Sequence, residues 1–104
     1  MTTKLKKVVP RKKPTQVPLA TRSAHLNFEN PTARSVFIAG SFNSWHPAAT
    51  EMISLGNGRW VKELRLAPGN YEYRFVVDGM WIPDPKAMET VPNPFGGVDS
   101  VLRV

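Results

Sequence analysis

The stretch NYEYRFVVDG, residues 70–79, decides the fold class of this chain. Its large apolar residues recur at every second position, and successive side chains of a β-strand point to opposite faces. We therefore expect a strand with a core-facing set of Tyr71, Tyr73, Phe75 and Val77 and an outward set of Glu72, Arg74 and Val76. The Asp-Gly pair that closes the stretch is typical of a tight hairpin turn.

Period-two patterns continue on both sides of this stretch. Further strands are expected at SAHLNFEN (23–30), RSVFIAG (34–40), RWVKELRL (59–66) and DSVLRV (99–104). The second of these is apolar on both faces, which indicates a central strand. Glycine- and proline-containing turns separate the strands, and no ten-residue stretch shows uninterrupted helical periodicity. Together these features predict an all-β fold, an antiparallel β-sandwich.

The net charge of +6 is concentrated at one end of the chain. The first fourteen residues contain no acid, and their basic residues are Lys4, Lys6, Lys7, Arg11, Lys12 and Lys13. The rest of the chain holds acidic and basic residues in equal number and is formally neutral. A nucleic-acid-binding domain usually carries its basic patch on the folded surface, so the charge pattern disfavours nucleic acid as a partner of the domain.

The charge pattern also suggests a division of the chain. Residues 1–20 are predicted to form a basic, disordered arm, because Pro10, Pro14 and Pro18 prevent a stable helix and like charges repel. Residues 21–104 are predicted to form the β-sandwich domain. Two roles stay open for the arm, a solubilising leader or linker, and a segment that touches nucleic acid or another anionic surface.

The sequence also indicates the cellular compartment in which the protein is expected. It contains no cysteine, which excludes disulfides, a thiol nucleophile and zinc sites built on thiolates. The N-terminal segment lacks the apolar core of a signal peptide, and no run approaches the roughly 18 apolar residues of a membrane span. We therefore expect a cytoplasmic protein with no membrane association.

No catalytic constellation is recognisable. The two histidines, His25 on a strand and His46 in a turn, lie in no nucleophile motif and are too few for a metal site. Asp78 opens an Asp-Gly turn and Asp84 lies between two prolines, so we interpret both as structural rather than as a glycosidase pair. The chain is expected to be no enzyme and to need no cofactor.

Two of the three tryptophans lie in turns, where a core cannot easily use them. Trp60 falls in phase with the apolar residues of its strand, but Trp45 and Trp81 have no such phase. They either plug an end of the sandwich or present flat rings to a ligand. The apolar face of a pyranose stacks on an indole ring, and an arginine such as Arg74 supplies several donors for sugar oxygens. Bases stack in the same way, but the neutral domain offers no positive groove for a phosphate backbone.

The motifs around these residues resemble a known family. VFIAGSFNSWHP, GRWVKELRLAPGNYEYRFVVDGMWIPDP and NPFGGVDSVLRV are similar to the family 48 carbohydrate-binding modules, over about residues 22–104. That family includes the glycogen-binding domain of the AMP-activated protein kinase β subunit and the N-terminal modules of branching and debranching enzymes. The resemblance implies an immunoglobulin-like β-sandwich of the early-set type that binds α-1,4-linked glucans such as glycogen, starch and maltooligosaccharides.

The resemblance also implies site residues. The tryptophans at the family's two stacking positions are Trp45 and Trp81 here, and the basic residue that hydrogen-bonds sugar hydroxyls, a lysine in the kinase branch, is Arg74. A third element departs from that branch, where a leucine is followed by a threonine and an asparagine. Phe95, Gly97 and Asp99 take these places. Phe95 would offer apolar surface and Asp99 a hydroxyl acceptor, but Gly97 cannot replace the threonine side chain.

Three functions follow as hypotheses. The first is a non-catalytic module that binds α-glucans. The second is a protein-interaction module that docks on a kinase or a glycan-active enzyme in trans. The third is binding of nucleic acid or an anionic surface through the basic arm, which would depend steeply on salt.

Overall fold

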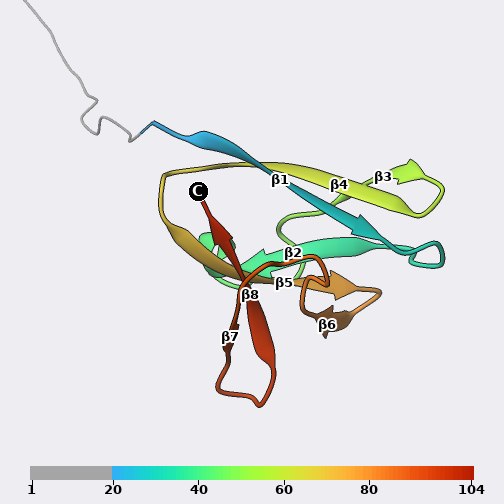
Figure 1. Cartoon of the computed structure of the whole chain (residues 1–104). Coiled ribbons are helices and arrows are strands. Elements are labelled where there is room, and N and C mark those ends of the chain that lie inside the picture. Colours follow the sequence, from blue (N-terminus) through green and yellow to red (C-terminus); the bar gives the residue numbers. More distant parts are fainter. Residues whose placement is uncertain (1–19) are drawn as a thin grey trace, which may run out of the picture.

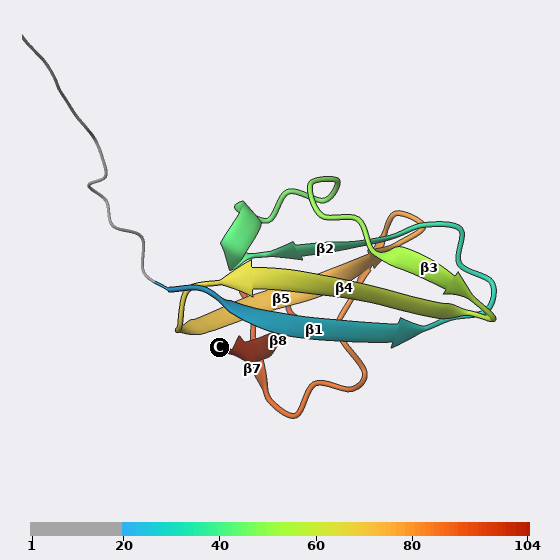
Figure 2. The ribbon, with the colours of Figure 1, turned by 90° about the horizontal axis from the view of Figure 1, so that it is seen from above.

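The structure, a computed structural model, describes residues 20–104 and shows two facing antiparallel sheets (Figures 1 and 2). The first sheet has the order β1-β4-β3, and the second has the order β2-β5-β8-β7 with β6 paired to β5. The strands are β1 (Arg22–Glu29), β2 (Val36–Gly40), β3 (Ile53–Gly56), β4 (Arg59–Leu66), β5 (Asn70–Val77), β6 (Met80–Ile82), β7 (Thr90–Pro92) and β8 (Val98–Arg103). The all-β sandwich predicted from the sequence is confirmed.

The long strands match the sequence prediction, whereas three short ones do not appear in it. β3, β6 and β7 have only three or four residues, too few to show a period of two. The immunoglobulin-like subtype stays a prediction. The arm predicted over residues 1–20 lies, except for Ala20, outside the described residues.

The strand β2 was expected in the centre of a sheet, and this position is wrong. β2 lies at the end of its sheet and pairs with β5 alone among the named strands. Its other edge is covered by the segment 50–52. Ile38 N–H donates to the Thr50 carbonyl, and Met52 N–H donates to the Val36 carbonyl, both at 2.8 Å. β2 is therefore hydrogen-bonded along both edges, although only one of its neighbours is a named strand.

The core lies between the sheets and contains most of the residues that the alternation predicts, but Tyr71, expected to face the core, is only partly buried and lies outside the buried cluster. Phe75, Ile38 and Val36 are fully buried, and Phe28 packs on Phe75 with ring centroids 4.9 Å apart. Trp60 is also buried, and its indole N–H donates to the Asn30 carbonyl at 3.3 Å. The outward side chains of β5 are therefore left free to build a surface site.

Asp84 has the structural role expected of it. Its carboxylate accepts hydrogen bonds from the buried Tyr73 hydroxyl and from Lys86 N–H. Asp84 N–H in turn donates to the buried Ser100 hydroxyl at 2.8 Å. Burial and the neighbouring Asp84 carboxylate raise the pKa of Tyr73, so the phenol is a neutral donor at physiological pH. This buried network ties the segment after β6 to β5 and β8.

The two ends of the described domain meet at the turn between β4 and β5. Arg22 pairs with Leu66 across the first sheet. Gly69 and Val104 exchange two backbone hydrogen bonds, each of 2.8 Å. The C-terminus accordingly lies near the start of β1 (Figure 1).

Candidate functional site

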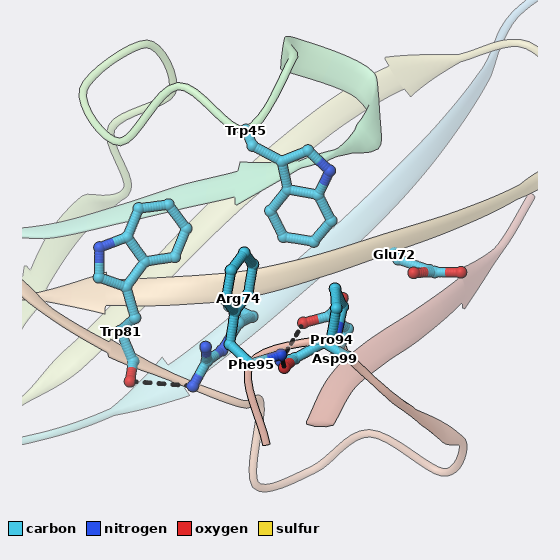
Figure 3. A pocket seen from close by; sticks show the side chains of 8 residues that line it. Trp45, Glu72, Arg74, Trp81, Pro94, Phe95 and Asp99 are labelled. Atoms are coloured by element: carbon cyan, nitrogen blue, oxygen red, sulfur yellow. Dashed lines mark hydrogen bonds between the residues drawn. The ribbon is translucent and has the colours of Figure 1, made fainter. Parts of the chain in front are cut away.

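The outer face of the second sheet carries a hollow of about 550 Å³ (Figure 3). We call it the outer hollow. It is lined by Trp45, Glu72, Arg74, Trp81, Asn93, Pro94, Phe95 and Asp99. All five residues that the sequence predicted for a carbohydrate site line it, so the structure brings them together. Glu72, Asn93 and Pro94 were not predicted as site residues.

The floor of the outer hollow is the outward face of β5. Glu72, Arg74 and Val76 follow one another at every second position, and β6 places Trp81 opposite Val76. A strand rises about 3.3 Å per residue, so this row extends for about 13 Å from Trp81 to Glu72. Val76 is buried although it faces outward. The outward face is therefore covered by side chains at one end.

The turn that delivers Trp45 begins with Gly40, the last residue of β2. A Cβ atom at Gly40 would lie 2.7 Å from the Glu72 carbonyl oxygen and 2.9 Å from the Tyr73 Cβ, so only glycine fits this approach to β5. Glu72 N–H donates to the Ser41 hydroxyl at 3.1 Å. Phe42 packs edge-on against Tyr71. The residues GSF thus fasten the turn to the start of β5.

Asn43 and two strained residues complete this turn. The Asn43 carboxamide donates to the Ile38 carbonyl and the Thr50 hydroxyl and accepts from Gly40 N–H, at 2.9–3.0 Å. Ser44 and Trp45 both have left-handed backbones, with φ of 58° and 59°. Such angles are rare for a bulky residue and cost on the order of 1–3 kcal/mol each. With these backbone angles, the half-buried indole ring of Trp45 points over the outer hollow.

Trp81 is delivered by a regular hairpin. Asp78 and Gly79 form its two-residue turn with φ of 49° and 86°, as the Asp-Gly pair predicts. The Asp78 carboxylate accepts from the N–H groups of Arg34 and Ser35, both at 2.9 Å. These bonds tie the hairpin to the segment before β2. The Trp81 side chain is 39% exposed.

Arg74 lies between the aromatic residues and is only partly free. Its Nη2 donates to the Trp81 carbonyl at 3.2 Å. Its Nε is buried and has no hydrogen-bond partner among residues 20–104. The guanidinium therefore holds the backbone at Trp81 and offers the outer hollow only its remaining donors.

The Trp45 turn and the Trp81 hairpin form two walls of the outer hollow. The third wall is the loop between β7 and β8, and Asn93 organises it. The Asn93 carboxamide oxygen accepts from Phe95 N–H and Gly97 N–H at 2.9 and 3.1 Å, and its Nδ2 donates to Asp99 Oδ1 at 3.1 Å. Phe95 is 92% exposed at the tip, whereas Asp99 is buried. One side chain thus sets the shape of the loop and the position of the carboxylate.

The arrangement suits a ligand with flat apolar faces and polar edges. Three aromatic rings provide apolar surface, and the polar groups at the floor and the third wall can hydrogen-bond with hydroxyls. Neither histidine lines the outer hollow. Within residues 20–104, no three potential metal ligands lie together. No helix in that part of the chain is long and apolar enough to cross a membrane.

Comparison with known proteins identifies a family for this geometry. Residues 23–104 match the family described as the glycogen recognition site of AMP-activated protein kinase. The chain is 39% identical over 64 residues to the chloroplastic protein FLOURY ENDOSPERM 6 of Oryza sativa subsp. japonica. It is 31% identical over 71 residues to 5'-AMP-activated protein kinase subunit beta-1 of Sus scrofa, and 29% identical over 79 residues to the amyloplastic phosphoglucan phosphatase DSP4 of Castanea sativa.

The similarity covers most of this chain but only part of each relative. The alignments include 62%, 68% and 76% of the chain and 12%, 55% and 21% of the rice, pig and chestnut proteins, respectively. The chain therefore corresponds to one module of these proteins.

Proposed function

This chain belongs to the family of the glycogen recognition site of AMP-activated protein kinase, and on that premise we propose that the outer hollow binds α-1,4-linked glucans. Glycogen, starch and maltooligosaccharides are the ligands that this proposal names. The observation that carries it is the convergence of Trp45 and Trp81, from separate loops, on one hollow with Arg74 at its floor.

Each side chain has a role in this proposal. Trp45 and Trp81 stack on the apolar faces of glucose rings, and each ring contributes roughly 1–3 kcal/mol, by analogy with base stacking. Arg74 donates to hydroxyls, and Asp99 accepts from them. Phe95 adds apolar surface from the third wall. A shallow site of this kind binds short oligosaccharides weakly, because little free energy is left after the entropic cost of association.

We further propose that the module does not catalyse glucan hydrolysis. Glu72 and Asp99 both line the outer hollow, so a pair of carboxylates is present. Asp99, however, is buried and one of its carboxylate oxygens is engaged by Asn93, which suits a fixed acceptor for a sugar hydroxyl. Incubation with maltoheptaose should generate no new reducing ends, and their steady release would contradict this part of the proposal.

Calorimetric titration with maltoheptaose tests the main proposal, with cellohexaose as the control for linkage. Trp45→Ala and Trp81→Ala should each weaken binding roughly tenfold or more, since about 1.4 kcal/mol corresponds to a factor of ten. Met88→Ala is a matched control, because Met88 is fully exposed and does not line the outer hollow. Failure of the folded wild-type protein to bind at millimolar maltoheptaose would refute the proposal.

A second candidate function is docking on a protein. Some relatives are kinase subunits by name, and on β3 the large side chains Ile53 and Leu55 are 56% and 51% exposed. The partner would be a kinase or a glycan-active enzyme on a separate chain. Ile53→Ser combined with Leu55→Ser should abolish such an association and leave glucan binding unchanged.

The expected cytoplasmic location stays a prediction. The rice and chestnut relatives are plastid proteins by name. Fractionation of cells that produce the full-length protein would test it.

A further inference from the structure

The charges around the outer hollow are unbalanced. Among the residues that line it, Arg74 is the only cation, whereas Glu72 and Asp99 are carboxylates. The other lining residues are aromatic or uncharged. At neutral pH the lining of the site therefore carries a net negative charge, and its apolar walls strengthen the effect of that charge on a bound group.

Arg74 does not offset this charge as a phosphate receptor would. A phosphate is best held by two adjacent N–H groups of one guanidinium. In Arg74, however, Nε is buried and Nη2 is engaged with the Trp81 carbonyl. The guanidinium therefore presents less than its full fork to a ligand, and the donors that remain suit single hydroxyls.

The Asp99 carboxylate is held in a fixed position and needs a hydrogen-bond donor from the ligand. Its side chain is 7% exposed, and Asn93 Nδ2 donates to its Oδ1. No other hydrogen bond to this carboxylate is formed within the described part of the chain. An ionised carboxylate only accepts, so a neutral sugar hydroxyl is a suitable partner. A phosphate dianion has no proton to donate and repels the carboxylate.

Glu72 places a second carboxylate, which would also repel a phosphate, at the other end of the floor. It lies two positions from Arg74 on the same face of β5, and its side chain is exposed. A glucan chain that lies along the row from Trp81 to Glu72 would therefore meet a carboxylate beyond the guanidinium. A phosphate ester on any glucose near Glu72 or Asp99 would be placed next to a like charge.

We propose that the outer hollow selects uncharged α-glucans and rejects glucans that carry phosphate esters, with Glu72 and Asp99 as the selecting residues. This selectivity rests on the proposed glucan-binding function. It identifies the ligand class as neutral glucan chains, or the unphosphorylated stretches of modified ones.

Calorimetry can test the selectivity with two probes, maltoheptaose and maltoheptaose phosphorylated at 6-hydroxyls. At about 50 mM salt the phosphorylated probe should bind the wild-type protein roughly three- to tenfold more weakly, and higher salt should narrow the gap. Glu72→Gln and Asp99→Asn, which nearly preserve side-chain shape, should each reduce the gap by about half, and the double variant should remove most of it. Glu63→Gln, on the far sheet, should leave the gap unchanged.

The possible results distinguish selectivity against phosphate esters from glucan binding itself. Equal binding of both probes to the wild-type protein would overturn the selectivity and leave the proposed function intact. A gap that persists in the double variant would also overturn it, because steric exclusion would then be the cause. Absence of binding to either probe would overturn the proposed function and the selectivity together.

Discussion

The two loops that carry Trp45 and Trp81 perform the same task by different means. The Trp45 turn is strained, with two consecutive left-handed residues, and it is held from within by Asn43. The Trp81 hairpin has an Asp-Gly turn, whose residues tolerate a positive φ, and it is held from outside because the Asp78 carboxylate accepts from N–H groups of the segment before β2. A strained turn keeps its shape only where its surroundings enforce it. The position of Trp45 should therefore depend more on single contacts than the position of Trp81 does.

Asn43→Ala should have the largest effect. It leaves the buried Gly40 N–H and the Ile38 carbonyl without their partner, which should lower the free energy of unfolding by about 2–4 kcal/mol. Binding of maltoheptaose should fall with it, because the Trp45 ring loses its support. Denaturant unfolding and calorimetry would measure both effects. Stability and affinity close to wild type would show that the strain is held elsewhere.

Asn93→Asp extends the comparison to the third wall. The new carboxylate still accepts from Phe95 N–H and Gly97 N–H but faces Asp99, so stability should fall by about 1–3 kcal/mol. The double variant Asn93→Asp with Asp99→Asn reverses donor and acceptor and should recover most of this loss. A double-mutant cycle on the free energy of unfolding measures the coupling. No recovery in the double variant would contradict the role given to Asn93.

Asp78→Ala should cost less than either change, about 1–2 kcal/mol of stability. It frees two N–H groups at an exposed position and places alanine at a φ of 49°. Asp78→Asn keeps the acceptor and tolerates this φ, so it should remain close to wild type. Maltoheptaose affinity should fall less in Asp78→Ala than in Asn43→Ala. The reverse order would break the comparison between the loops.

Ser44→Gly should have the smallest effect and the opposite sign. Glycine adopts a φ of 58° without a Cβ penalty, although it also gains freedom in the unfolded chain, so stability should rise by about 0.5 kcal/mol. Ala48→Gly, in the same loop but with no left-handed backbone, should instead lower stability slightly. Equal changes in the two variants would show that the turn is not strained.

Much of this molecule follows from local patterns in the sequence. The long strands are predicted because their side chains alternate over several residues, and the hairpin of Trp81 because Asp-Gly has its own turn chemistry. The strained Trp45 turn is not predicted, since its shape depends on a long-range approach of Gly40 to β5. The edge position of β2 is missed for a similar reason, because segment 50–52 covers it.

The site divides in the same way. The five predicted residues line one hollow, while their roles in carbohydrate binding stay predictions. Glu72 was visible in the pattern as an outward residue of the same strand as Arg74, so the alternation could have identified it. Asn93 could not be found from the pattern, because its role comes from the path of the loop and not from any spacing. Hydrogen bonds within a loop leave no periodic signal.

The meeting of both domain ends at the turn between β4 and β5 determines how the domain yields to a mechanical load. Tension through residues 22 and 104 acts across the strands, so it peels β1 from β4 one pair at a time, from Arg22 and Leu66 towards Glu29 and Arg59. Such unzipping needs less force than shearing all pairs at once. The same tension also pulls β8 from β5, beginning at the pair of Arg103 and Asn70, so both sheets carry the load at this end of the domain.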